Sequence, residues 1–546
     1  ILRLLEEIPN SGTIITAGTG SGKTLAYYLP ILLRVGDLIQ AKNYWVKALS
    51  IYPRTELLKD QLAETFKRSR MLDQALKDNN KRPILMGAFF GSTPNNANHK
   101  SLEYKKKEGW QRLRGSFICP WFSCPKCGGN LIWRDEDLNN QLERLNCIQV
   151  NCDTIIDETQ LVLTRSSLAK NPPDLLFTTT EMLNQRMSDI EYQKLFGLGQ
   201  RSNQKPHFIL LDEAHTYAGI NGAQAALVLR RWRHLLNAPV TWCGLSATLN
   251  EGTRFFSELV GIKTESVLEI KPETEELDKE GAEYQIILKG DPTLSASILS
   301  TSIQSAMLTA RMLDPIREPN PISEGYFGKR LFIFTDDLDV TNRLFDNICD
   351  AEENLHLAAL RGRGNDDNQR DAEGQRWRAC ERIGHDLEDN LIVGRTSSQD
   401  TGVHINANVI VATAALEVGY DDEDVGAVLQ HKAPRSYASF LQRKGRAGRT
   451  RGMRPITVTI LSEYGRDRVS FQNYEHLFDP SVPYLPLPIQ NQYVLRIQAV
   501  YSLIDWLATQ IKNNQIKFGW LWNVLSKPAE NRSDNNLIVE VKKSLQ

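Results

Sequence analysis

Residues 17–24 read Ala-Gly-Thr-Gly-Ser-Gly-Lys-Thr, and this stretch decides how the chain around it folds. It lies between a short β-prone run at 12–16 and an apolar segment with the pattern of a helix. Glycines in this position let backbone N–H groups and the helix N-terminus face a phosphate. The pattern predicts a nucleotide-binding loop in which Lys23 reaches the terminal phosphates and the Thr24 hydroxyl binds Mg²⁺.

Strand-like runs alternate with helix-like runs on both sides of a polar, cysteine-bearing segment. The runs of the first series include DLLFTTTEML, HFILLDEAH and PVTWCGLSATL, and those of the second are RLFIFTDD, ANVIVATAAL, AVLQHK and ITVTILSE. This alternation predicts an α/β fold with doubly wound parallel sheets. We expect a first domain over 1–265 with an insertion at 95–170, a linker at 266–299, a second domain over 300–465, and a helical C-terminal region at 466–546 that begins a further domain.

Composition excludes several classes of protein. The 546 residues are 41% hydrophobic and 24% charged, with a formal net charge of −1, which argues against a disordered, fibrous or globally basic chain. No apolar run approaches the roughly 18–20 residues of a membrane span, and no signal peptide is evident. We therefore expect a soluble, cytoplasmic protein without a membrane partner, and we read the opening Ile1 as the start of an excised piece of a longer chain.

A carboxylate pair follows the apolar run FILL at 208–211. Asp212, at the carboxyl end of a parallel strand beside the phosphate loop, is placed to hold Mg²⁺ through water. Glu213 can then polarise the attacking water.

A basic motif, QRKGRAGR at 442–449, lies in the second series. Such a cluster is often a solvated face or a phosphate contact. Arg446 and Arg449, one helical turn apart, can also neutralise charge on the γ-phosphate from the opposing domain.

Together these motifs resemble those of superfamily 2 helicases, which have two tandem RecA-like domains. The resemblance is carried by AGTGSGKT at 17–24, DEAH at 212–215, SAT at 246–248 and QRKGRAGR at 442–449. The segments GSTP at 91–94, ATAALEVGYD at 412–421 and SYASFLQRKGRAGR are most similar to the 3′-to-5′ DNA helicases of the Hrq/Mrf type, and similar cores occur in large bacterial genome-defence helicases. The resemblance to superfamily 2 helicases covers nearly the whole chain outside 95–170 and the C-terminal region.

The resemblance implies an ATP-dependent DNA helicase or translocase that moves on single-stranded DNA loaded from a duplex, with a role in bacterial antiviral defence and partner proteins in a defence complex. A DNA sensor or scaffold that hydrolyses ATP without unwinding, and an RNA-remodelling ATPase, stay open as alternatives. The resemblance assigns ATP and Mg²⁺ binding to Gly20, Ser21, Gly22, Lys23, Thr24 and Asp212. It assigns catalysis to Glu213, Gln442, Arg446 and Arg449. Coupling is assigned to His215, Ser246, Thr248, Glu417, Gly419 and Asp421, and nucleic-acid contact to Arg54, Thr55, Thr180, Glu181 and Thr413.

Five of the eight cysteines lie between Cys119 and Cys152, which points to metal binding rather than disulfides in a reducing compartment. The expected ligands are Cys124, Cys127, Cys147 and Cys152, a zinc-ribbon-like Cys₄ set with Cys119 left over. Zn²⁺ is expected, and an iron–sulfur cluster stays open. Because the insertion is small and polar, we expect it to fold only with its metal bound.

Two further basic stretches need interpretation. The stretch at 100–114 either contacts phosphates and stacks Tyr104 and Trp110 on bases, or is a solvated amphipathic helix. Arg230, Arg231 and Arg233 are expected on an exposed helix face.

Overall fold

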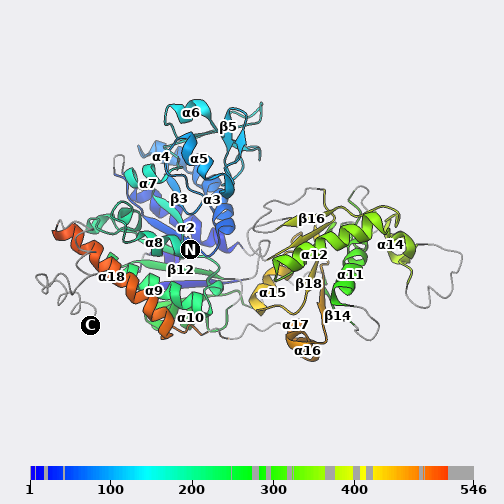
Figure 1. Cartoon of the computed structure of the whole chain (residues 1–546). Coiled ribbons are helices and arrows are strands. Elements are labelled where there is room, and N and C mark those ends of the chain that lie inside the picture. Colours follow the sequence, from blue (N-terminus) through cyan, green and yellow to red (C-terminus); the bar gives the residue numbers. More distant parts are fainter. Residues whose placement is uncertain are drawn as a thin grey trace, which may run out of the picture. The chain divides into compact units, whose positions relative to one another are not determined.

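The computed structural model divides into two compact units, Ile1–Lys271 with Tyr484–Gln546, and Pro272–Pro483. Each unit has its own parallel sheet (Figure 1), so the predicted α/β class is confirmed. The structure describes residues 2–6, 8–17, 22–40, 43–246, 249–273, 282–290, 297–316, 323, 325–362, 375–396, 406–413, 422–478, 484 and 486–514.

The first unit is built on an eight-stranded sheet in which every pairing is parallel. In spatial order the strands are β13 (Val267–Ile270), β1 (Gly12–Thr16), β12 (Thr241–Ser246), β11 (Phe208–Leu211), β2 (Ala48–Tyr52), β10 (Leu175–Thr179), β3 (Met86–Phe89) and β9 (Leu161–Val162). The inner strands β2 and β11 are buried along their whole length, which fits their continuous apolar sequences.

Helices that connect these strands complete the first unit. They are α1 (Leu2–Leu5), α2 (Lys23–Leu38), α3 (Thr55–Arg70), α4 (Asp73–Asp78), α7 (Arg165–Lys170), α8 (Thr180–Arg186), α9 (Gly219–Leu236) and α10 (Gly252–Val260). The main core joins the apolar faces of α8, α9 and α10 to the sheet, and Trp232 of α9 packs edge-on against Trp242 of β12.

The cysteine-bearing insertion forms a separate antiparallel sheet that leaves the parallel sheet after β3 and returns at β9. Its strands follow each other in the order β4 (Arg112–Leu113), β5 (Ser116–Ile118), β6 (Leu131–Arg134), β7 (Arg144–Cys147) and β8 (Ile155–Asp157), and its short helices are α5 (His99–Tyr104) and α6 (Asp135–Asn139). β6 and β7 pair in antiparallel fashion, with α6 between them in the sequence.

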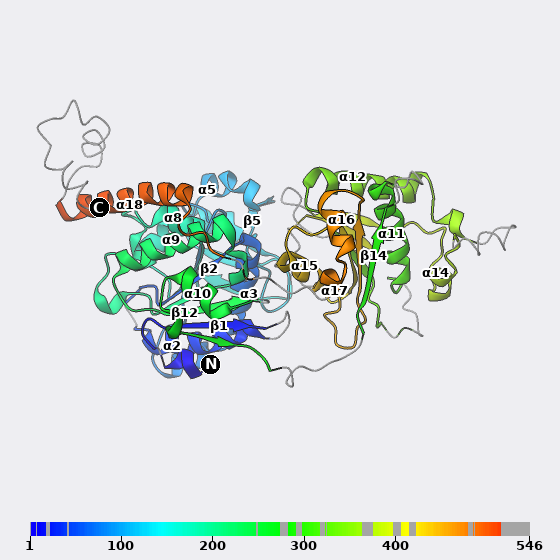
Figure 2. The same ribbon diagram turned by 90° about the horizontal axis from the view of Figure 1, so that it is seen from below.

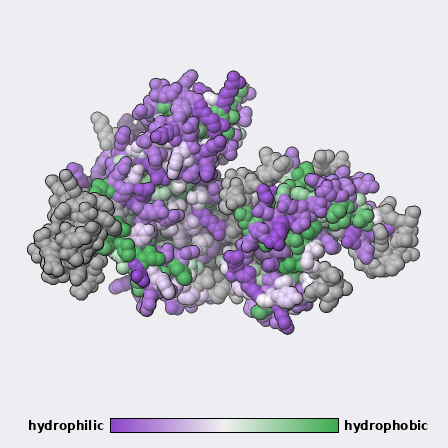
Figure 3. Space-filling view, viewed as in Figure 1, coloured by the Kyte–Doolittle hydropathy of each residue, from purple (hydrophilic) through white to green (hydrophobic). Residues whose placement is uncertain are grey.

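The insertion has an aromatic core, which the sequence interpretation did not expect. Trp110, Trp121 and Trp133 are each at most 2% exposed, and Trp110 lies about equally close to both partners, at 6.0 and 5.9 Å between ring centroids. The outer surface of the insertion is mostly hydrophilic (Figure 3). Trp110 is therefore unable to stack on a base, which rules out base stacking by Trp110 as one of the two interpretations of 100–114. The Trp110 indole N–H instead donates to the backbone carbonyl of Ser92, 2.9 Å away.

The second unit is built on a six-stranded parallel sheet. In spatial order its strands are β14 (Tyr284–Lys289), β19 (Ile456–Leu461), β18 (Val425–His431), β15 (Arg330–Phe334), β17 (Val409–Ala412) and β16 (Val393–Thr396). Its helices are α11 (Ile298–Met312), α12 (Leu338–Cys349), α14 (Arg378–Ile383), α15 (Tyr437–Lys444), α16 (Gly465–Gln472) and α17 (Glu475–Phe478).

Two regions differ from the sequence interpretation. The segment 266–299, expected to be a linker, contributes the strands β13 and β14 to the two sheets. Both strands are mostly apolar but lie at sheet edges, where acidic neighbours are tolerated. The long helix α18 (Gln492–Asn514) lies beside α9 and α8 in the first unit (Figure 2).

The contact between α18 and α9 is polar as well as apolar. The Arg231 guanidinium of α9 lies 2.7 Å from the Asp505 carboxylate of α18 and donates to Gln498 and to Asn184. No helix of the described ranges is both long and apolar enough to cross a membrane.

Candidate functional site

The carboxyl ends of three neighbouring strands, β1, β12 and β11, bring the predicted nucleotide-binding residues together. Lys23 begins α2, and its ammonium donates to the carbonyl of Ala17 at 2.6 Å. Burial lowers the pKa of Lys23, and the carboxylates of Glu213 and Asp212 oppose that shift. The sequence separates these carboxylates from Lys23 by about 190 residues, and the strand order makes them neighbours.

Gly22, directly before α2, has a backbone conformation that favours glycine. Gly22 adopts φ 77°, in the left-handed region, and a Cβ there would meet no atom within 4 Å. Its conformation, rather than crowding, is what requires glycine. Thr24 follows Lys23 in the first turn of α2. The predicted ligands Gly20 and Ser21 lie outside the described residues.

Asp212 is buried at the end of β11, where it accepts a hydrogen bond from the Glu213 backbone N–H at 2.7 Å. Burial, reinforced by the neighbouring Glu213 carboxylate, raises the pKa of Asp212 to about 7. A bound cation would favour the ionised carboxylate. Glu213 itself has φ 46°, a left-handed conformation that is uncommon for a non-glycine residue and marks a constrained turn.

His215 and Ser246 connect this carboxylate pair to the neighbouring strand. His215 Nδ1 lies 3.0 Å from Ser246 Oγ and 3.4 Å from a carboxylate oxygen of Glu213. Ser246 is the last residue of β12, and both His215 and Ser246 are buried. The structure thus joins two motifs that the sequence interpretation assigned to coupling. Thr248 lies outside the described residues.

The next three strands of the same edge are β2, β10 and β3, and the ends of β2 and β10 carry four of the five residues predicted to contact nucleic acid. Arg54 precedes α3 and Thr55 begins it, directly after β2. Thr180 and Glu181 begin α8 after β10, where the Thr179 hydroxyl accepts a hydrogen bond from the Met182 N–H. We call the ends of these three strands the nucleic-acid edge.

The turn after β3, residues 90–94, is the third part of the nucleic-acid edge, and no site residue was predicted in it. Ser92, Thr93 and Pro94 are buried, while Gly91 is exposed. The Thr93 hydroxyl donates to the Ala88 carbonyl at 2.8 Å. The likeness of GSTP to a family segment was the only sequence signal for this turn.

In the second unit the basic motif is divided between a helix and the turn that follows it. Gln442 is buried within α15, which ends at Lys444. Arg446 and Arg449 therefore lie beyond the helix, so their spacing is not a helical turn. The helix has already ended at Lys444, and further along the turn Gly448 has φ 74° with Pro455 packed where a Cβ would stand, so glycine is required there.

Arg443, which the sequence interpretation did not single out, holds this motif in place. Its guanidinium lies 2.7 Å from the Asp336 carboxylate and donates to the Gln430 side chain at 2.8 Å. Asp336 lies just after β15, and Gln430 is the second-last residue of β18. Arg443 therefore connects α15 to the carboxyl edge of the second sheet. Thr413 follows β17 at this edge. The predicted residues Glu417, Gly419 and Asp421 lie outside the described residues.

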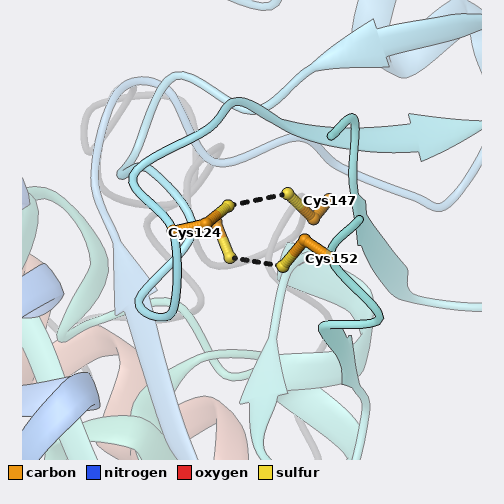
Figure 4. A group of neighbouring side chains, drawn as sticks. Cys124, Cys147 and Cys152 are labelled. Atoms are coloured by element: carbon orange, nitrogen blue, oxygen red, sulfur yellow. Dashed lines mark hydrogen bonds between the residues drawn. The ribbon is translucent and has the colours of Figure 1, made fainter. Parts of the chain in front are cut away.

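The four predicted metal ligands converge. The Sγ atoms of Cys124, Cys127, Cys147 and Cys152 all lie within 4.8 Å of one another. Sγ–Sγ distances are 3.7 Å for Cys124–Cys152 and 3.3 Å for Cys127–Cys147, and the labelled thiols face one another in Figure 4. Thiolates placed tetrahedrally about 2.3 Å from one ion are about 3.8 Å apart. The set therefore fits a single ion, and Cys119 lies outside it.

Local hydrogen bonds prepare the thiols for metal. The Cys124 N–H donates to Gly129 O at 2.7 Å, which closes the tight turn. Hydrogen bonds from Thr154 lower the pKa of Cys152 to about 6, favouring the thiolate that binds metal. Cys119 is buried, and its burial raises its thiol pKa to about 12, as suits a packing residue.

The three arginines after the carboxylate pair have structural partners rather than an open face. Arg230 and Arg233 donate to backbone carbonyls at the end of α10. Arg230 donates to the carbonyl of Glu258 at 2.6 Å, and Arg233 donates to that of Val260 at 3.5 Å. Arg231 contacts α18. The prediction of an exposed basic face is therefore wrong.

Two family models match parts of the chain, and several known proteins are similar to it. The DEAD/DEAH box helicase family matches residues 3–102, and the helicase conserved C-terminal domain matches 397–451. The Druantia protein DruE of Escherichia coli (strain UMEA 4076-1) is 25% identical over 310 residues, which cover 47% of this chain and 16% of that protein. The Lhr helicase/uracil glycosylase of E. coli (strain K12) is 27% identical over 298 residues, covering 52% of this chain and 18% of that protein. The chain thus carries the two regions, a DEAD/DEAH box region and a C-terminal region, by which superfamily 2 helicases are recognised.

Solved structures share the fold of this chain. The Lhr helicase of Mycobacterium smegmatis bound to single-stranded DNA and AMP-PNP superposes with a TM-score of 0.55 at 19% identity, covering 92% of this chain and 50% of that chain. The DUF1998 helicase MrfA bound to DNA gives 0.52 at 14% identity, covering 91% and 50%. These likenesses confirm the two RecA-like domains. The match to this chain spans under a fifth of the length of each of these curated relatives.

Proposed function

We propose that this helicase couples hydrolysis of Mg·ATP to movement along single-stranded DNA. The observation that carries the proposal is the division of one sheet edge into two adjacent halves. The nucleotide residues follow β1, β12 and β11, and four of the residues proposed to contact nucleic acid follow β2 and β10, beside β3. The halves meet at the paired strands β11 and β2, where the Asp212 N–H donates to the Ile51 carbonyl at 3.3 Å.

Within the first half each side chain has a distinct proposed role. Lys23 leaves Ala17 for the β- and γ-phosphates, and Thr24 with Asp212 binds Mg²⁺, which neutralises charge on the phosphates when bound. Glu213 orients the attacking water and accepts its proton. The phosphate loop is completed by Gly20, Ser21 and Gly22.

The second unit is proposed to act when it closes on the nucleotide. Gln442, Arg446 and Arg449 then bind the γ-phosphate and stabilise the charge that develops on it. The residues proposed to pass this closure to the DNA are His215, Ser246, Thr248, Glu417, Gly419 and Asp421. Arg54, Thr55, Thr180, Glu181 and Thr413 are proposed to hold the strand itself. Alternate closing and reopening would shift one domain along the strand.

One experiment separates this function from its two rivals. The purified protein is assayed for ATP turnover and strand displacement on matched DNA and RNA duplexes with a single-stranded tail. Displacement of DNA alone is expected. Turnover without displacement would favour the sensor, and displacement of RNA alone would favour the remodelling ATPase. The RNA alternative is supported by the likeness to Mss116p bound to single-stranded RNA, with a TM-score of 0.51 at 15% identity.

We also propose that the four cysteines hold structural Zn²⁺. All four positions around the ion are taken by thiols, so no position is left for a substrate or water, as is usual in structural zinc sites. Thiols this close together surround one ion more easily than the larger body of an iron–sulfur cluster. Elemental analysis is expected to give one zinc per chain, and iron with visible absorption would overturn the choice of zinc.

A role in cytoplasmic antiviral defence is a further proposal, supported by the similarity to Druantia protein DruE. Bacteria carrying the intact gene neighbourhood should resist phage infection better than bacteria with a Lys23→Ala copy. Equal resistance would remove this role, and any partner proteins proposed with it, without affecting the motor.

A further inference from the structure

The metal-binding loop, residues 119–129, is packed directly onto the first parallel-sheet domain. Two aromatic residues stand just ahead of Cys124. The Phe122 ring lies 5.3 Å from the ring of Phe66, in α3. The Trp121 ring lies 5.7 Å from the ring of Phe90, and its indole N–H donates to the Ser92 hydroxyl at 3.4 Å.

Both contacted elements belong to the nucleic-acid edge. The helix α3 begins at Thr55 and carries Phe66 three turns later, so a contact at Phe66 constrains the orientation of its N-terminus. Ser92 lies in the turn after β3. The loop therefore touches two of the three elements that form this edge.

The turn after β3 has little freedom to move on its own. Arg165 of α7 donates from Nε to the Thr93 carbonyl at 3.1 Å and from a terminal nitrogen to the Phe90 carbonyl at 3.2 Å. The insertion contacts the same turn through two indole N–H groups. That of Trp110 donates to the Ser92 carbonyl, and that of Trp121 donates to the Ser92 hydroxyl. Displacement of Trp121 would thus remove one of the two hydrogen bonds that the insertion donates to Ser92, together with the ring contact to Phe90.

We infer that Trp121 and Phe122 are positioning residues through which metal binding sets the geometry of the nucleic-acid edge. A metal ion links the turn holding Cys124 and Cys127 to Cys147 and Cys152 on the other side of the hairpin. This link holds the loop against α3 and Ser92, and without it the aromatic pair loses its support. The inference rests on the proposed function of that edge.

A direct contact between the loop and nucleic acid is the competing explanation. It would act through side chains on the outer surface of the insertion, such as Val150, which is 98% exposed, and Lys126. Trp121 is 2% exposed and faces inward, so the two explanations involve different side chains.

The first test measures hydrogen–deuterium exchange in the full chain and does not depend on activity. Cys124→Ser and the metal-retaining double variant Trp121→Phe/Phe122→Ala should both raise exchange in residues 55–70 and 90–95, by about tenfold. Tyr104→Ala, an exposed aromatic of the same insertion (78% exposed), is the matched control and should change neither segment. Unchanged exchange in the double variant, with zinc content intact, would overturn the inference.

The second test compares affinities for a fluorescent single-stranded DNA. The aromatic double variant should bind about tenfold more weakly with normal nucleotide binding, and adding Cys124→Ser should weaken it no further, since both act through one contact. Full additivity, or a loss confined to Val150→Asp and Lys126→Ala, would show direct contact instead. If the unaltered protein fails to bind nucleic acid, the proposed function fails, while the exchange result still decides the coupling.

Discussion

Replacing Asp174 with asparagine should destabilise the first unit more than any surface change. The carboxylate of Asp174 is fully buried before β10 and lies 2.6 Å from the ammonium of Lys47, which is also fully buried. It accepts a hydrogen bond from the Leu85 N–H at 2.9 Å and from Arg82 at 2.8 Å. Three strands, β2, β3 and β10, therefore meet at this one side chain.

The magnitude follows from what Asp174→Asn leaves behind. An unpaired ammonium in the interior costs about 3–5 kcal/mol, because Lys47 loses its counter-charge without regaining water. For a unit of this size the loss lowers the melting temperature by roughly 10 °C. Lys47→Met added to Asp174→Asn should recover most of the loss, because it removes the stranded charge.

Thermal unfolding followed by tryptophan fluorescence tests this prediction, since Lys47 lies 4.4 Å from the centre of the Trp45 ring. Glu56→Gln is the control. It breaks an exposed pair with Lys59 and should change stability by no more than about 0.5 kcal/mol. A shift for Asp174→Asn as small as the control, or a double variant less stable than the single one, would refute the reasoning.

Three other predictions concern the motor and the second unit. Arg446→Ala should lower DNA-stimulated ATP turnover by about a hundredfold while nucleotide binding persists, and normal turnover would contradict its proposed role. Ser246→Ala removes the hydrogen bond to His215 and should reduce strand displacement about tenfold at nearly normal ATP turnover; equal losses of both would argue against coupling. Burial lowers the pKa of His431 to about 4 in the folded chain, against an ordinary value near 6.5. Between pH 6.5 and pH 4 the unfolded chain therefore binds a proton at this residue and the folded chain does not. Stability should fall by up to about 3 kcal/mol as the pH drops from 6.5 to 4, and His431→Asn, compared by urea unfolding at both pH values, should flatten that dependence.

The local motifs were the part of the site that sequence could predict. The phosphate loop and the carboxylate pair each concentrate their chemistry in a few consecutive residues, and the cysteines form two close pairs, Cys124 with Cys127 and Cys147 with Cys152. The parallel sheets followed from strand-like runs that alternate with helices. Strand order was not predictable from these runs, although it places β2 beside β11 and so brings the two halves of the edge together.

Long-range partners explain what sequence could not show. In the sequence, Trp110 stands among basic residues, as an aromatic residue that contacts nucleic acid would. In the structure its indole N–H instead donates to the carbonyl of Ser92, 18 residues earlier. Arg443 looks like one of several similar arginines until Asp336 is found beside it. In both cases the deciding partner belongs to another element, and neither periodicity nor composition identifies it.

The place where the insertion joins the sheet also bears on how such helicases can diversify and be re-engineered. β3 and β9 pair at the outer side of the sheet, with Met86 opposite Leu161, so the chain leaves and returns at adjacent points. A module can be gained, lost or exchanged at such a junction while the strands that carry the nucleotide residues keep their order. Any exchange must also cover Phe66 and Phe90, because the present module shields both rings from water. Grafts that bring their own aromatic pair are therefore the natural candidates for giving this motor a new accessory domain.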